Sequence, residues 1–178
     1  DSIVYMNLDK ISMAEIKEHM KEVKRSKAII CDLRGYPNSN HQIISHFMRK
    51  RDTCKTWMQV PNILYPNQEQ ITEWEKYGWQ MLRRRPYLGD KNVIFITSPS
   101  AISYAESVLG LVKGYNLATI VGQPSAGANG NINPFRITGG YSISWTGMKV
   151  TRLNGEQHHT VGVLPDVYVN QTVAGIKA

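Results

Sequence analysis

Three serines stand at the predicted start of a helix, directly after an apolar run: Ser98, Ser100 and Ser103 in TSPSAISYAE (97–106). Unpaired N–H groups and the helix dipole favour developing negative charge at such a position. A serine there can act as a nucleophile whose oxyanion is held by neighbouring amides. The local pattern also fits a structural role, which it favours, because Ser98 or Ser100 can cap the helix and Ser103 can pair with Glu106 in a capping box.

Two other turns follow apolar runs. The first, DLRGYPNSN (32–40), would expose backbone N–H groups at the carboxyl end of a buried strand, which suits an oxyanion or a carboxylate. The second, VGQPSAGANG (121–130), lacks both the Lys-Ser/Thr pair and the spaced glycines of phosphate-binding loops. We therefore expect no nucleotide site.

The spacing of histidines and cysteines gives no support for metal or disulfide chemistry. The histidines are His19, His41, His46, His158 and His159. No third ligand at a zinc-like spacing accompanies the adjacent pair at 158–159, and Cys31 and Cys54 make no disulfide framework. We expect no metal and no cofactor. Cys31 lies in an apolar run and is predicted to be a small core residue.

The elements that must position these turns follow from the apolar pattern. Continuous apolar runs predict strands of a parallel sheet that is buried on both faces. A stripe beginning at the Ser12–Glu15 capping box predicts a helix ending near Arg25, and a second helix over 101–113 completes a βαβ crossover. The predicted strands are 3–8, 27–33, 92–97 and 117–121, followed by antiparallel closing strands at 141–145, 148–153 and 163–169. The sequence thus predicts an α/β fold with a central, largely parallel sheet.

Composition limits the class of protein. The 178 residues are 42% apolar and 20% charged, which is enough for one domain with a core and argues against disorder. The net charge of +7 permits acidic partners without requiring them, and no apolar run approaches the ~20 residues of a membrane span. Because the chain opens on Asp1 without a signal-type segment, we expect a mature form or a piece of a longer protein.

Residues 49–86 break the strand–helix rhythm. They hold two basic runs and three of the four tryptophans, with a short helix predicted over 69–82. Basic residues interleaved with aromatics can bind single-stranded nucleic acid, but no nucleic-acid fold signature accompanies them, so we expect no nucleic-acid partner. We predict that 1–178 is one domain in which 49–86 is a lid-like insertion.

Several segments, taken in order, resemble one known family. They are KAIICDLRGYPNS (27–39), NVIFITSPSAISYAESVLGLVKGYNLATIVGQPSAGANG (92–130), GGYSISWTGMKV (139–150) and GVLPDVYV (162–169). The family is that of the C-terminal processing peptidases, the tail-specific and tricorn-type serine proteases. The resemblance implies a Clp-protease/crotonase-like fold, a serine endopeptidase acting on protein or peptide substrates, and a preceding PDZ domain and N-terminal segment. It also implies a location in the bacterial cell envelope, periplasmic or extracytoplasmic.

The resemblance assigns roles to individual residues. Its nucleophile motif aligns with SYAE (103–106), which implies Ser103 as the nucleophile and the Tyr104 amide as one oxyanion donor. The second donor is expected at Gly35 or Asn38, although PNS stands where the family has consecutive glycines.

The general base departs from the family pattern. The lysine of the tail-specific branch aligns with Ala128, so a Ser-Lys dyad of that type is excluded. The tricorn-type branch has an upstream histidine, beyond the first residue of this chain, and an acid where this chain has His159. We therefore expect a base outside this chain, with His159 as a non-standard third catalytic member.

Two functions stay open at this point. One is an endopeptidase that forms an acyl-enzyme on Ser103, and the other is a catalytically inactive pseudo-protease that binds peptides. The register of Ser103 and the start of the chain favour the first, which is the function we expect, whereas Ala128 and the missing consecutive glycines point to the second. We expect the chain alone to be nearly inactive, because a missing base leaves the serine hydroxyl unactivated. The basic runs of 49–86 are expected to face an acidic peptide or a C-terminal carboxylate.

Overall fold

The structure, a computed structural model, describes residues 2–50, 75, 78, 81–172 and 175. Its centre is a five-stranded sheet in the order β1-β2-β3-β4-β7, in which every neighbouring pair is parallel. The strands are β1 (Ile3–Asn7), β2 (Ala28–Asp32), β3 (Asn92–Thr97), β4 (Thr119–Gly122) and β7 (Val167–Tyr168). The predicted α/β fold with a central parallel sheet is confirmed.

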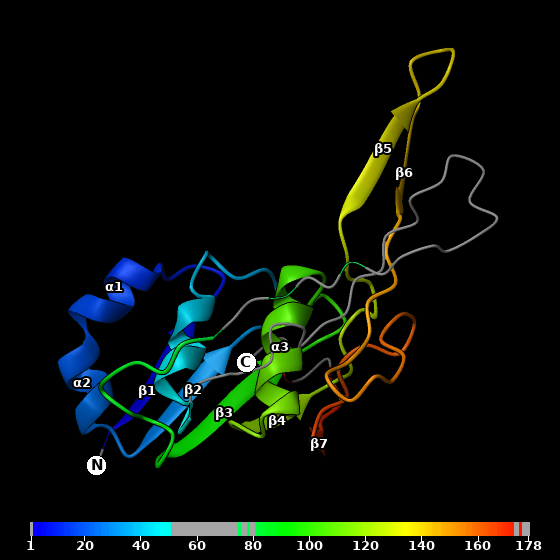
Figure 1. Cartoon of the computed structure of the whole chain (residues 1–178). Coiled ribbons are helices and arrows are strands. Elements are labelled where there is room, and N and C mark those ends of the chain that lie inside the picture. Colours follow the sequence, from blue (N-terminus) through cyan, green and yellow to red (C-terminus); the bar gives the residue numbers. More distant parts are fainter. Residues whose placement is uncertain (1, 51–74, 76–77, 79–80, 173–174, 176–178) are drawn as a thin grey trace.

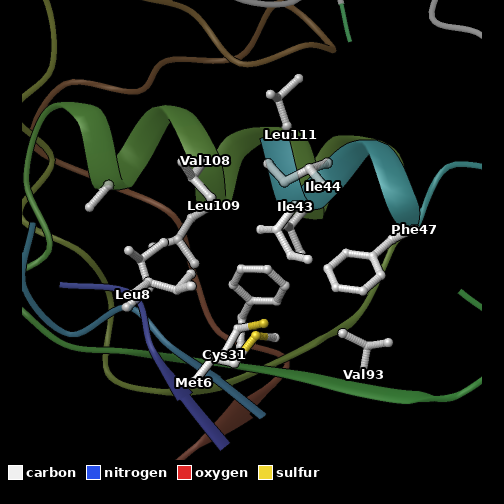
Figure 2. Close-up of a cluster of buried hydrophobic side chains, with 14 of the residues drawn as sticks. Met6, Leu8, Cys31, Ile43, Ile44, Phe47, Val93, Val108, Leu109 and Leu111 are labelled. Atoms are coloured by element: carbon white, nitrogen blue, oxygen red, sulfur yellow. The ribbon is translucent and has the colours of Figure 1, made fainter. Parts of the chain in front are cut away.

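Helix α3 (Tyr104–Gly114) and the 3-10 helix η1 (His41–His46) pack on one face of this sheet (Figure 1). Figure 2 shows the core between them, with Met6, Cys31 and Val93 pointing from the strands toward Ile43 and Leu109. All five side chains are at most 5% exposed. Cys31 is fully buried and packs as a core hydrophobe, as predicted, and this burial raises the pKa of its thiol.

The first helical region differs from its prediction. The capping box is present, because Ser12 Oγ accepts the Glu15 N–H at 3.2 Å and the Glu15 carboxylate accepts the Ser12 N–H at 2.7 Å. The single helix expected up to Arg25 is instead two, α1 (Met13–Glu18) and α2 (Met20–Arg25), broken at His19. The apolar stripe could not predict this break, because its residues face the core both before and after His19.

The end of the chain also differs from the prediction. The strand expected at 163–169 is β7, which pairs parallel to β4 rather than antiparallel. Asp166 fixes this direction, because its N–H donates to the Ile120 carbonyl at 2.7 Å and its carboxylate accepts the Ile120 N–H at 2.8 Å. The residues of the expected strand at 148–153 form no continuous strand, although Thr151 makes an isolated bridge with Gln157.

A two-stranded antiparallel hairpin extends away from the sheet and helices (Figure 1). It consists of β5 (Ile132–Arg136) and β6 (Ser142–Thr146). Strand β6 confirms the prediction over 141–145. Strand β5 was not predicted, because it lies in a stretch rich in glycine. The turn between them needs Gly139 and Gly140, whose φ angles are 93° and 81°.

Most of the predicted insertion, including nearly all of the helix expected over 69–82, lies outside the described residues. At its edges, Arg49 Nε donates to Tyr87 Oη at 2.9 Å, and Met81 is buried. Among the described residues, no helix is both long enough and apolar enough to span a bilayer.

Candidate active site

Ser103 is the residue immediately before α3, where the β3–α3 turn becomes helix. Its backbone has φ 54° and ψ −108°, a conformation that costs a non-glycine residue about 1–3 kcal/mol. Such strain persists only where surrounding contacts fix the backbone. It distinguishes Ser103 from the other two serines of this turn.

Ser98 and Ser100 hold the turn together. Ser98 Oγ donates to the Arg34 carbonyl at 2.7 Å and accepts the Ser100 N–H at 3.1 Å. These contacts connect the β3–α3 turn to the turn after β2. Neither serine is the cap of α3, because Ser103 occupies that position.

The backbone N–H of Ser103 is held by two acceptors. It donates to the Ala128 carbonyl at 3.0 Å and to Glu106 Oε2 at 3.2 Å. The carboxylate half of the predicted Ser-x-x-Glu capping box is therefore present. Ala128 has no amine to offer, but its main chain lies against that of the expected nucleophile.

Glu106 is fully buried and accepts further hydrogen bonds from the loop 125–128. Its Oε1 accepts from Ser125 Oγ at 2.6 Å and from the Gly127 N–H at 2.7 Å, and its Oε2 accepts from the Ala128 N–H at 3.0 Å. Burial alone would raise the pKa of this carboxyl, but His158, Ser125 and Gly127 outweigh it and hold the pKa below its usual value. The resulting carboxylate ties the loop to the start of α3.

His158 completes this buried cluster. It is 1% exposed, and its Nε2 lies 3.4 Å from Glu106 Oε1, with no better hydrogen-bond partner in the described part of the chain. Ser125 Oγ in turn accepts the Val163 N–H at 2.7 Å. Gly162 is required beside it, because a Cβ there would lie 2.5 Å from the Ser125 carbonyl oxygen. The residues before β7 are thus connected through Glu106 to the turn that carries Ser103.

His159 faces the main chain that follows the hairpin. Its Nε2 accepts the Val150 N–H at 2.9 Å. Burial, with a smaller contribution from His158, lowers the pKa of this imidazole, while the Met148 backbone and Glu106 oppose the shift. His159 is therefore neutral at neutral pH, and this nitrogen is already engaged. Its part in proton transfer stays a prediction.

The turn after β2 holds Gly35 and Asn38, whose part as oxyanion donors stays a prediction. Asp9 lies against Gly35, because a Cβ on Gly35 would lie 2.0 Å from Asp9 Oδ2. The Asn38 N–H donates to the Leu8 carbonyl at 2.8 Å. Tyr36 lies between them, and its N–H has no hydrogen-bond partner among the described residues.

Two side chains that the sequence did not predict as site residues, His41 and Tyr36, contact Tyr104 at the start of α3. His41 Nδ1 lies 2.5 Å from Tyr104 Oη, and the Tyr36 and Tyr104 rings approach to 5.7 Å between centroids. Burial, followed by the charge of Arg84, lowers the pKa of His41. No local pattern could have found this contact, because the partners are far apart in sequence.

An ion pair beside the same turn was also missed. Asp32 is 4% exposed and accepts from Arg34 Nε at 2.9 Å and Nη2 at 2.7 Å, and from Tyr5 Oη at 2.5 Å. Burial would raise the pKa of Asp32, but Arg34 and Tyr5 lower it overall. The pair lines a cavity of about 510 Å³ at the carboxyl ends of the strands. The Asp-x-Arg spacing in DLRG could have predicted this ion pair, because the two residues are close in sequence.

A second cavity of about 630 Å³ lies between the carboxyl half of α3 and residues 152–165, with His158 in its wall. Of the residues that the structure describes, Ser103 lines neither cavity. Within the same described ranges, no three His, Cys, Asp or Glu side chains gather where a metal ion could bind.

Comparison with known proteins gives a family match and structural neighbours. Residues 2–169 match the family model described as Peptidase family S41. No curated protein matches the chain. A CPAF variant aligns with TM-score 0.72 and 15% identity, over 98% of this chain and 46% of that one. A candidate peptidase from Parabacteroides merdae gives 0.69 and 16%, over 98% and 56%.

The photosystem II D1 C-terminal processing protease aligns with TM-score 0.62 and 13% identity, over 94% of this chain and 42% of that one. At these identities the likeness shows the fold. The chain spans about half the length of the structures it matches.

Proposed function

This chain belongs to peptidase family S41, and from this premise we propose that it is the nucleophile-bearing domain of a serine endopeptidase. The observation that carries the proposal is the strained backbone of Ser103, held before α3 by Ala128 and Glu106. A strained backbone that is held by a buried carboxylate is typical of a residue whose position serves chemistry. The substrates are polypeptides.

In the proposed reaction, Ser103 Oγ attacks the carbonyl carbon of a peptide bond while its proton passes to a general base. The tetrahedral intermediate collapses, the C–N bond breaks, and the leaving amine takes up that proton. Water then attacks the acyl-enzyme ester, which releases the acid product and restores the serine hydroxyl.

Backbone amides stabilise the oxyanion in this proposal. The Tyr104 N–H, at the first position of α3, is one donor, where the helix dipole adds to its effect. For the second donor we propose the Tyr36 N–H, because the Asn38 N–H is engaged with the Leu8 carbonyl and Asp9 lies close against Gly35. The ring contact between Tyr36 and Tyr104 supports this choice.

We place the general base outside residues 1–178. Ala128 offers no amine, and the Nε2 of His159 is occupied by the Val150 N–H. The structures that this chain matches are about twice as long, which leaves room for a base from a further segment, with a PDZ domain among the parts expected there.

The test is covalent labelling of the full-length protein with a fluorophosphonate probe. We expect labelling of the wild type and of Ser100→Ala, and none of Ser103→Ala. Ser100 is the matched control because it lies on the same turn. A folded, full-length wild type that resists the probe would overturn the proposal.

The alternative is a pseudo-protease that binds peptides without cleaving them. Ala128 at the position of the family's lysine favours it. Peptide binding with no turnover by the full-length protein would support this alternative, whereas turnover that Ser103→Ala abolishes would dismiss it.

We further propose that the protein works in the bacterial cell envelope, in line with the resemblance to C-terminal processing peptidases. Fractionation of the source cells tests this location. Recovery with cytoplasmic markers would contradict it.

A further inference from the structure

The β5–β6 hairpin has two chemically different faces. The strand register pairs Phe135 with Ile143, and the Ile137 N–H donates to the Tyr141 carbonyl at 3.0 Å just beyond the strands. Side chains alternate along a strand, and directly paired residues share a face. One face therefore carries Asn133 and five large side chains, and we call these five the hairpin apolar face: Phe135, Ile137, Tyr141, Ile143 and Trp145.

The hairpin apolar face is open to solvent. Its five side chains are between 42% exposed, at Ile137, and 71% exposed, at Tyr141. Phe135 and Trp145 meet edge to face, with ring centroids 5.3 Å apart. Figure 1 shows the hairpin reaching away from the sheet and helices, which explains why they leave this face uncovered.

The opposite face is largely polar. It carries Arg136 and the hydroxyls of Ser142, Ser144 and Thr146, together with Pro134 and Ile132. Such division into apolar and polar faces is the pattern of a sheet that is covered on one side. A two-stranded ribbon is marginally stable by itself in water, and a cluster of large exposed apolar side chains marks an interaction surface.

We propose that the hairpin apolar face is a dimer interface, covered by the same face of a second copy of this chain. Five side chains of this size expose on the order of 500 Å². Two such faces in contact would bury at most about 1,000 Å², below the roughly 1,200–2,000 Å² of stable interfaces, so we expect a weak dimer. The contact is isologous, so the two copies are related by a two-fold axis.

The charges on the hairpin agree with self-association. The apolar face carries no ionisable group other than the Tyr141 phenol, and Arg136 lies on the opposite face. Two identical faces therefore meet without like-charge repulsion. Phe135, Tyr141 and Trp145 are of the residue types that anchor interfaces. This inference is independent of the proposed peptidase activity, because the face does not include Ser103 or Glu106.

Sedimentation velocity of the full 178-residue chain across about 1–200 µM tests the dimer. We expect a species of twice the 20.2 kDa monomer mass. Phe135→Ser combined with Trp145→Ser is expected to raise the dimer dissociation constant by at least about 100-fold. Ile132→Ser is the matched control, since Ile132 is 67% exposed on the opposite face and should leave the dimer intact.

A cross-linking measurement keeps the proposal testable if the double variant fails to fold. In a Cys54→Ser background, Ile143→Cys should give a disulfide-linked dimer on mild oxidation, and Ser144→Cys on the opposite face should not. A wild type that stays monomeric up to 200 µM would overturn the proposal and leave another molecule as the occupant of this face. Equal cross-linking of the two cysteine variants would also overturn it.

Discussion

The start of α3 and the β5–β6 hairpin differ in how their side chains find partners. Around Ser103, the polar groups of Glu106, Ser125 and the loop at 125–128 are paired with one another inside the protein. Along the hairpin, large apolar side chains have no covering layer among the described residues.

The contrast separates a region that holds a fixed geometry by itself from one that needs a partner. A buried, fully paired carboxylate resists rearrangement, because breaking any one of its bonds leaves a buried polar group unsatisfied. Moving the exposed hairpin breaks no buried hydrogen bond. Its apolar side chains are removed from water only when another surface covers them. The following predictions test each side of this contrast, from the largest effect to the smallest.

Glu106→Ala should destabilise the fold by about 3–5 kcal/mol, because it leaves His158 and the donors of the loop without their acceptor. Urea unfolding measures the loss. Glu156→Ala is the control: this residue is an exposed partner of Arg152, and its loss should cost less than about 1 kcal/mol. Equal losses from the two variants would show that the buried pairing is unimportant.

Acid should weaken the fold through the groups whose pKa is lowered in the folded state. The pKa of His159 lies below 6.5, so the unfolded chain binds its proton first, and stability is lost as the pH falls below about 6.5. His159→Gln, whose amide oxygen can still accept the Val150 N–H, should reduce this slope by up to about 1.4 kcal/mol per pH unit. Urea unfolding between pH 5 and 7.5 measures it. An unchanged slope would contradict the assignment.

The strain at Ser103 predicts an inverted preference between two small residues. Ser103→Gly should be more stable than Ser103→Ala by about 1 kcal/mol, because glycine adopts a positive φ without strain. At Ser107, inside α3, the same pair should rank the other way. Thermal unfolding of the four variants tests both orders. Alanine being the more stable residue at both positions would indicate that Ser103 is not strained.

The smallest effect is expected on the hairpin. Phe135→Ser should change the free energy of unfolding by less than about 0.5 kcal/mol when measured below the dimer dissociation constant. Leu109→Ala, which empties part of the core, should cost about 2–5 kcal/mol. A comparable loss at Phe135 would show that the hairpin is part of the cooperative core.

Local patterns in the sequence determined the four strands β1 to β4 and helix α3, and they marked the turn that carries Ser103. Buried parallel strands are continuous apolar runs, and a capping box such as Ser12–Glu15 is a contact between near neighbours. Both signals are complete within a few residues. The Ser-x-x-Glu pattern at 103–106 could be predicted for the same reason.

Only the tertiary structure decided which distant residues complete the site. Ser125 and His158 converge on Glu106 from separate loops, and His41 reaches Tyr104 across 63 positions. The parallel direction of β7 and the break at His19 also depend on packing. Periodicity reports which face of a single element is apolar. Periodicity does not predict which loops meet over that element, because those contacts form only when the sheet brings the strand ends together.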